Sequence, residues 1–329
     1  MDAPCSKPTP SPINYHPSFT SSTADVTLSS SDGLHYRLPS YTLRTTSGLF
    51  NTLLSLPRGG DRSCAIVIPT NEPSDALTTF LFLLTGRGLP PSGVSESSSS
   101  SSFGAITRLV GLAEKWDAPG PLSYIRAGLT SAHLLRSDPL GVFQIACHFE
   151  WLPERHLAAR HTLLIDLLTG ELLHPESGSV DDVAERNQRT LQRLSSKDLM
   201  FLFRLRRLRR DKFREIITST VHFAAGNSDN YFCSRCGVTR IDNRTWKAFR
   251  ARLIAEIDQY PLGDTITGRE VGGIGGTPGL DARYWPEALH CWEAECTGDG
   301  CGGKNYGKEA TLEQIRRCID SLPFEIDDQ

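Results

Sequence analysis

The chain has 329 residues, of which 39% are hydrophobic and 22% charged, and its formal net charge is -3. This length is enough for roughly two domains with cores of their own, and a slightly acidic balance disfavours a protein that coats nucleic acid. The N-terminus lacks the apolar segment of a secretory signal, and the longest apolar run is too short to cross a bilayer. We therefore expect a cytoplasmic or nuclear protein without membrane contact, whose nine cysteines are free thiols or metal ligands.

The chain begins with a polar tail that leads into a predicted hairpin. Residues 1–22 are rich in Pro and Ser and lack periodicity, which predicts a disordered tail. Residues 24–28 and 34–38 alternate apolar and polar side chains on either side of the turn SSDG, which predicts two paired strands. The run CAIVIP over 64–69 predicts a further, buried strand.

Helical periodicity dominates the chain from there to residue 226. Ser74 or Asp75 is expected to cap a helix, and Asp138 followed by Pro139 is a typical helix start. The Ser-rich stretch over 90–102 predicts a loop. We expect helices over 41–56 with a break at Ser47 and Gly48, 74–86, 103–129 with a break at Pro119–Pro121, 137–168, and 183–226 with a break at Ser195 and Ser196.

Four motifs in the first 130 residues occur in the order of a known family. They are ADVTL with Asp25, YTLRTTSGLF with Ser47 and Phe50, FLFLLTGRG, and LVGLAEKWDAPGPLSYIRAGL. Together they resemble the first strand, the helix with a Ser-x-x-Phe motif, the helix ending in Tyr-Thr-Gly, and the closing helices of a BTB/POZ domain. The residues in register with the closing helices are Ala113, Lys115, Trp116 and Leu122. The resemblance implies an α+β domain over 23–135, in which helices pack on a small sheet.

The sequence departs from this family just before the Ser-x-x-Phe helix. Members usually carry His-Lys or His-Arg at the places of Pro39 and Ser40, and a buried Asp pairs with the basic residue in members that recruit corepressors. This chain keeps Asp25 but lacks the basic partner. Because an unpaired buried carboxylate is costly, we expect Asp25 to be solvated or capped, and corepressor-type binding is not implied.

Residues 136–225 resemble the helical extension of BTB proteins that are abundant in fungi. The stretches DPLGVFQIACHFEWLPERHLAARHTL and LSSKDLMFLFRLRRLRRDKF carry this likeness. The resemblance implies a non-enzymatic protein that binds protein partners and self-associates as a homodimer. Docking on a cullin scaffold as a ubiquitin-ligase adaptor is one branch of this role in the family. Residues 226–329 would follow as a separate C-terminal module.

The C-terminal module contains two cysteine pairs. Cys233 and Cys236 form a C-x-x-C-G motif, and Cys296 and Cys301 bracket TGDG about 59 residues later. Two cysteine-bearing turns are the usual way to supply four tetrahedral ligands to structural zinc. The rival ligands are Cys291, His222 and His290. Free thiols around a loop are the alternative interpretation.

The stretch GDGCGGK matches the spacing of a phosphate-binding loop, but its context argues against that function. No buried strand precedes it, and Asn305 stands where Mg²⁺ would need a hydroxyl. We therefore expect Lys304 to be a surface lysine. A search for a nucleophile elbow, a zinc-protease helix and kinase motifs finds none, so no catalytic residue is predicted.

Seven basic residues lie between Arg204 and Arg214. Their interleaving with Phe203, Leu205, Leu208 and Phe213 favours an amphipathic helix whose basic face is solvated. Nucleic-acid binding by this helix, in a transcriptional regulator, is the alternative function.

Overall fold

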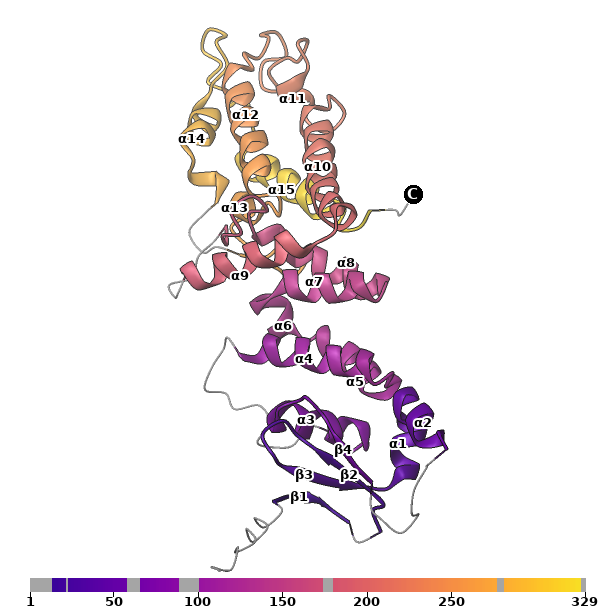
Figure 1. Cartoon of the computed structure of the whole chain (residues 1–329). Helices are drawn as coiled ribbons and strands as arrows, with labels where there is room; N and C mark the ends of the chain where they lie inside the picture. The colour runs from indigo at the N-terminus through magenta and orange to yellow at the C-terminus, as the bar shows by residue number, and fades with distance from the viewer. Residues whose placement is uncertain are drawn as a thin grey trace, which may run out of the picture. The chain divides into compact units, whose positions relative to one another are not determined.

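The computed structural model describes residues 14–21, 23–57, 66–88, 101–173, 180–276 and 281–326. It is a mixed α+β structure with one small sheet and many helices (Figure 1). Its contacts divide the chain into two compact units, residues 1–131 and residues 132–329. The loop expected over 90–102 lies outside the described residues, except that its last two positions begin a helix. A further division of the second unit into an extension and a module stays a prediction.

The sheet of the first unit has four strands in the order β1-β3-β2-β4. The predicted hairpin is confirmed, because β2 and β3 pair antiparallel with Leu28 opposite Tyr36. The predicted third strand is present as β4, which pairs parallel to β2. The strands are β1 (Tyr15–Thr20), β2 (Val26–Ser29), β3 (His35–Leu38) and β4 (Ile66–Pro69).

Strand β1 corrects the expectation of a disordered tail over 1–22 for residues 15–20, while residues 1–13 lie outside the described part of the chain. It pairs parallel to β3 at the edge of the sheet, where Pro17 is tolerated because an edge strand leaves backbone groups unpaired. Phe19 is buried and packs edge-on against Phe82, and the His16 ring stacks on Tyr36. These aromatic contacts come from distant residues, so local periodicity could not reveal the strand.

Five helices complete the described part of the first unit, and α3 packs on the sheet (Figure 1). The Tyr36 hydroxyl of β3 lies 3.0 Å from the carbonyl oxygen of Ser74 and 2.8 Å from the Thr78 hydroxyl, both on α3. Trp116 packs edge-on between Phe50 and Phe80, which joins three helical segments in one core. The helices are α1 (Ser40–Thr46), α2 (Gly48–Ser55), α3 (Ser74–Leu84), α4 (Ser101–Lys115) and α5 (Pro119–Leu129).

Side chains outside the helices cap α1 and α3. Asp25 is exposed and accepts hydrogen bonds from the Ser40 amide and hydroxyl, so the predicted capped or solvated state is confirmed. The cap of α3 is Asp32, not Ser74 or Asp75: its carboxylate accepts from the Ser74 amide and hydroxyl. This cap crosses 42 positions of sequence and therefore leaves no local signal.

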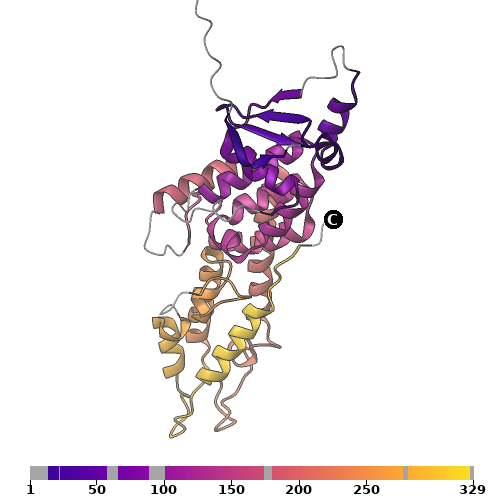
Figure 2. The same cartoon turned by 90° about the horizontal axis from the view of Figure 1, so that it is seen from below.

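The second unit is helical, and α10 packs on both α12 and α15 (Figures 1 and 2). The break before α10 is confirmed, because the Ser195 side chain caps it by accepting from the Asp198 amide. Asp138 caps α7 through the Gly141 amide, as predicted. The elements are α6 (Ala132–Ser137), α7 (Pro139–His148), α8 (Leu152–His161), η1 (Thr162–Leu164), α9 (Val180–Arg193), α10 (Ser196–Thr218), α11 (Ala224–Asn227), α12 (Arg244–Gln259), α13 (Asp264–Thr267), η2 (Ala282–Tyr284), α14 (Pro286–Glu293) and α15 (Lys308–Asp320).

Apolar faces of α12 and α15 form much of the core of the second unit. Trp246, Phe249, Leu253 and Ile257 of α12 are buried. Leu312, Ile315 and Ile319 of α15 are buried as well. Within the described part of the chain, no helix has the length and apolar character needed to cross a membrane.

Candidate metal centre

Two loops of the second unit bring the four predicted cysteines together. One loop precedes α12 and the other joins α14 to α15, and both lie at the same end of the unit, at the top of Figure 1. The Sγ atoms of Cys233 and Cys301 are 3.7 Å apart, and those of Cys236 and Cys296 are 3.8 Å apart. All four ligand atoms lie within 4.8 Å of one another.

The first cysteine turn is a tight backbone loop around Cys233 and Cys236. The Cys233 amide donates to the carbonyl of Thr239, and the Gly237 amide donates back to the carbonyl of Cys233, each at 2.8 Å. Gly237 has a φ of 68°, which a residue without a Cβ adopts at little cost. The C-x-x-C-G motif is therefore a turn that aims both thiols to one side.

The second cysteine turn is longer but closes in a similar way. The Cys296 amide donates to the carbonyl of Gly303 at 2.8 Å, and the Cys301 amide donates to that of Gly298 at 3.0 Å. Lys304, just beyond the turn, forms a 2.9 Å ion pair with Glu295 at the surface, where we expected it. Because its ammonium group is paired with Glu295, Lys304 is not placed to bind a phosphate.

Glycines let the two turns approach closely. A Cβ on Gly298 would lie 2.4 Å from the Thr239 hydroxyl oxygen, and one on Gly303 would lie 2.9 Å from the Cβ of Arg235. Both distances are too short for a side chain without displacement of the opposite turn. The glycines that suggested a phosphate loop thus serve the contact between the two cysteine turns.

Backbone amides favour the thiolate form in the first turn. The amides of Thr239 and Val238 lower the pKa of Cys236 to about 6, and those of Cys236 and Arg235 lower the pKa of Cys233. At Cys301 the Gly303 amide also acts to lower the pKa, but burial and the neighbouring thiols outweigh it and raise the pKa to about 11. Four negative sulfurs at this spacing repel one another, and a bound cation would offset that repulsion.

The spacing of the sulfurs fits a metal better than a disulfide. A disulfide requires about 2.0 Å between sulfurs. A tetrahedral ion with bonds of about 2.3 Å separates its sulfur ligands by about 3.8 Å. The sulfur distances of 3.7 and 3.8 Å match the second geometry. The four cysteines are therefore placed to hold one tetrahedral metal ion, for which a sulfur set selects a soft or borderline metal.

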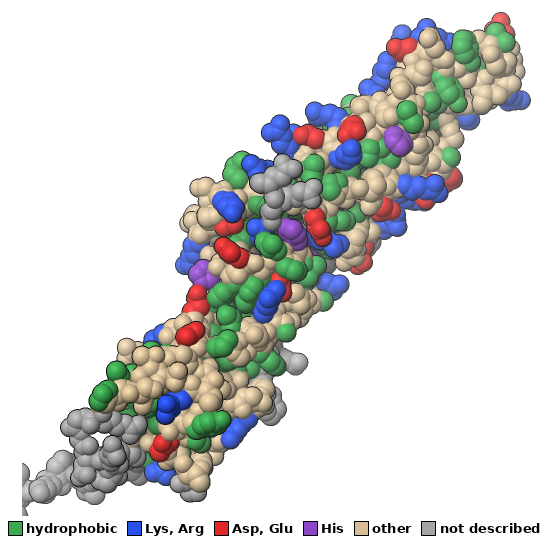
Figure 3. Space-filling model, turned by 90° about the vertical axis from the view of Figure 1, so that its right-hand side faces the viewer, with side chains coloured by type: hydrophobic (Ala, Val, Ile, Leu, Met, Phe, Trp, Pro, Cys, Tyr) green, Lys and Arg blue, Asp and Glu red, His purple; other side chains and the backbone are tan. Residues whose placement is uncertain are grey.

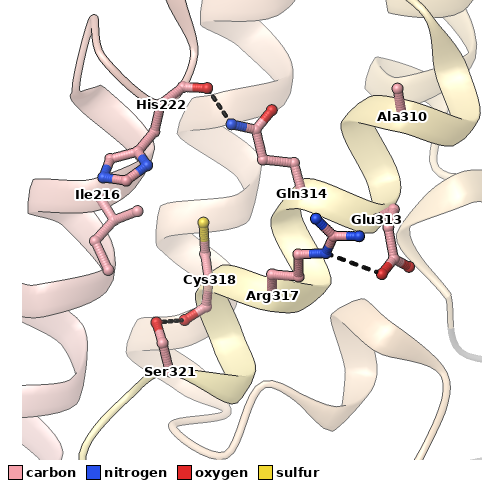
Figure 4. Close-up of a pocket in the computed structure, with 8 residues that line it drawn as sticks. All are labelled: Ile216, His222, Ala310, Glu313, Gln314, Arg317, Cys318 and Ser321. Atoms are coloured by element: carbon pink, nitrogen blue, oxygen red, sulfur yellow. Dashed lines mark hydrogen bonds and ion pairs between the residues drawn. The ribbon is translucent and has the colours of Figure 1, made fainter.

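The rival ligands lie elsewhere in the second unit. Among the described residues, the metal-ligand group at this site contains the four cysteines without Cys291 or a histidine. Cys291 is buried on α14, and burial raises its pKa to about 12. His222 lines a hollow of about 510 Å³ between α10 and α15, where the Gln314 amide group donates to its carbonyl (Figure 4). His290 is an exposed residue of α14.

The basic run over 204–214 lies on α10, but its charges are not all solvated as expected. Arg209 is fully buried and donates to the carbonyls of Pro261, Leu262, Leu322 and Pro323 at 2.8–3.2 Å. Arg206 is part-buried and donates to two carbonyls near η1. Sequence reasoning missed this role, because a buried arginine that binds carbonyls has no local signature.

The remaining charges of α10 are largely paired. Arg207 and Arg210 contact Asp211, and Lys212 contacts Glu215. On the face of the second unit in the upper part of Figure 3, Lys and Arg side chains alternate with Asp and Glu. The structure therefore offers less free positive charge on this helix than the sequence indicated.

Comparison of the chain with models of known protein families, with curated proteins and with solved structures yields no match.

Proposed function

We propose that this chain is a non-enzymatic interaction protein that forms a homodimer through its first unit, which has a BTB/POZ-like fold. The observation that carries the proposal is an exposed apolar face on α1 and α2. Leu49 and Leu53 are 39% and 42% exposed and lie four residues apart on one side of α2, and Leu56, just after the helix, is 60% exposed. Tyr41 on α1 is 76% exposed.

A second copy of the chain is the occupant that this face fits. Monomeric proteins rarely expose contiguous apolar patches, and a two-fold axis lets one patch cover itself. α1 and α2 also line a hollow of about 360 Å³ with Tyr41, Arg44 and Asn51, which has room for a side chain from the partner. Burial of four large apolar side chains per copy would contribute several kcal/mol before the cost of association.

The sheet and helices also support the BTB/POZ assignment. The first unit has a hairpin, a parallel third strand, two short helices broken at Ser47, and closing helices around Trp116. These features occur in the order that the sequence resemblance implies. The assignment also implies that the chain recruits protein partners, with docking on a cullin-type scaffold as one such role.

The metal in our proposal is zinc, held for structure and not for catalysis. Four cysteines leave no open position for a substrate or a water, which is typical of structural sites. The ion would join two loops that lie 60 positions apart in sequence. It would thereby hold the loop before α12 against the loop after α14.

The alternative, a transcriptional regulator that binds nucleic acid through α10, receives less support, because Arg209 and Arg206 are engaged inside the unit. Sedimentation of the full chain tests the favoured function directly, since a homodimer has twice the 36.3 kDa of the chain.

A further inference from the structure

The first cysteine turn carries a short two-stranded ribbon with one exposed face. Phe232 pairs antiparallel with Arg240, and the Ile241 amide donates to the carbonyl of Tyr231 at 3.0 Å. Paired residues share a face and neighbours alternate, so Phe232 and Arg240 point away from the metal ligands. Cys233 and Thr239, one residue further in, form the inner face.

The outer face is unusually apolar for an exposed turn. Phe232 is 51% exposed and Val238, on the same side of the ribbon as Arg240, is 80% exposed. Cys233, the residue after Phe232, is only 1% exposed, because its side chain lies on the inner face of the ribbon. An aromatic ring is thus presented to solvent on a backbone that the metal centre would hold in place.

Positive charge accompanies the ring. In the described part of the chain, Arg235 and Arg240 take part in no ion pair, and both are exposed. Arg235 packs beside Gly302 and Gly303 of the second turn, so its guanidinium lies near the metal centre.

Three carboxylates at this end of the unit form ion pairs. The ion pairs are Asp229 with Lys247 at 3.8 Å, Asp242 with Arg244 at 3.7 Å, and Glu295 with Lys304 at 2.9 Å. Among the described residues, Asp299 in the second turn and Glu293 at the end of α14 are exposed carboxylates that take part in no ion pair. Arg240, the cross-strand partner of Phe232, is therefore the positive charge that a ligand of the outer face would meet beside the ring.

We propose that this ribbon binds a short stretch of single-stranded nucleic acid, with a base stacked on Phe232 and a phosphate paired with Arg240. A ring beside a free guanidinium offers stacking and charge together, which single strands exploit because their bases are unstacked. A duplex hides the faces of its bases, and a peptide of Asp and Glu alone has no flat ring to cover Phe232. The inference rests on the proposed zinc, which holds the ribbon rigid.

The test uses the full chain as purified and a fluorescein-labelled oligouridylate of about twelve nucleotides, with binding followed by anisotropy between about 50 and 200 mM salt. Phe232→Ala should weaken binding at least about fivefold, since one stacked base contributes roughly 1–3 kcal/mol, and Phe232→Trp should retain it. Arg240→Gln should reduce the slope of log affinity against log salt by about 0.7. Asp299→Asn should strengthen binding.

Two control variants match these changes. Tyr284→Ala removes an aromatic ring that is 67% exposed on η2, and Arg214→Gln removes an exposed charge of α10. Both should bind like the unchanged chain. Absence of binding, equal effects of Phe232→Ala and Tyr284→Ala, or equal competition by a duplex or an acidic peptide would overturn the proposal. The metal content of each variant is measured as well, because Phe232→Ala should keep its metal. This measurement distinguishes failure of the nucleic-acid proposal from failure of the zinc proposal.

Discussion

The Sγ atoms of Cys233 and Cys301 lie 3.7 Å apart, although 68 positions of sequence separate the two residues. This distance is the spacing of two ligands on one tetrahedral ion. If a metal joins them, it ties together two loops that flank α12 and α14, and removal of the metal should loosen this end of the second unit.

Metal content is the first prediction. We expect about one zinc per purified chain by plasma mass spectrometry, because four thiolates fill its coordination shell. Cys236→Ser should lose most of the metal, since it removes a ligand. Cys147→Ser is the matched control, because Cys147 lies on α7 outside the cluster, and it should retain the metal. A chain purified without metal under reducing conditions would contradict the zinc proposal.

Arg209 is expected to stabilise the second unit. Arg209→Lys should lower the free energy of unfolding by about 2–5 kcal/mol, because a lysine cannot reach all the buried carbonyls that the guanidinium binds. Urea denaturation followed by circular dichroism measures this change.

Arg207→Lys is the control for Arg209. The Arg207 side chain is 76% exposed on the same helix, and its substitution should change the free energy of unfolding by no more than about 0.5 kcal/mol. Equal effects of the two substitutions would show that the buried hydrogen bonds of Arg209 are not important for stability.

His161 should make the chain less stable in mild acid. Burial, with the nearby charges of Arg160 and Arg136, lowers its pKa from 6.5 to about 4. The unfolded chain therefore binds more protons than the folded chain between these values, and stability is lost as the pH falls from about 6.5 toward about 4. Above about 6.5 the contribution is fully present.

Comparison with His161→Gln isolates this effect from other titrating groups. The loss of unfolding free energy between pH 7 and pH 5 should be smaller in the variant, because glutamine does not titrate. Urea denaturation at both pH values measures it. An identical loss in both proteins would mean that His161 has the same proton affinity in the folded and unfolded chain.

Much of the fold could be predicted where the signal is local. The hairpin around SSDG, the break at Ser47 and the cap at Asp138 each depend on neighbouring residues, and the structure contains all three. Strand β1 and the Asp32 cap could not be predicted, because each depends on a partner far along the chain.

The candidate metal site likewise has features that the sequence could predict and features that it could not. The C-x-x-C-G motif and the second cysteine pair were visible as sequence, and the structure places their four sulfurs together. Sequence spacing alone could not exclude Cys291 as a metal ligand, since its distance from the other thiols depends on the direction in which α14 presents its side chain. The burial of Arg209 was hidden for a similar reason: its acceptors are backbone carbonyls, which every residue has.

The most direct test of the proposed function is the mass of the full chain in solution, measured by sedimentation equilibrium at micromolar concentration. We expect twice 36.3 kDa for the unchanged chain and a shift toward monomer for Leu53→Glu, which places a charge in the apolar face of α2. Leu168→Glu, at a 79% exposed leucine of the second unit, should remain a dimer. A strict monomer for the unchanged chain, or a dimer that Leu53→Glu leaves intact, would contradict self-association through α1 and α2.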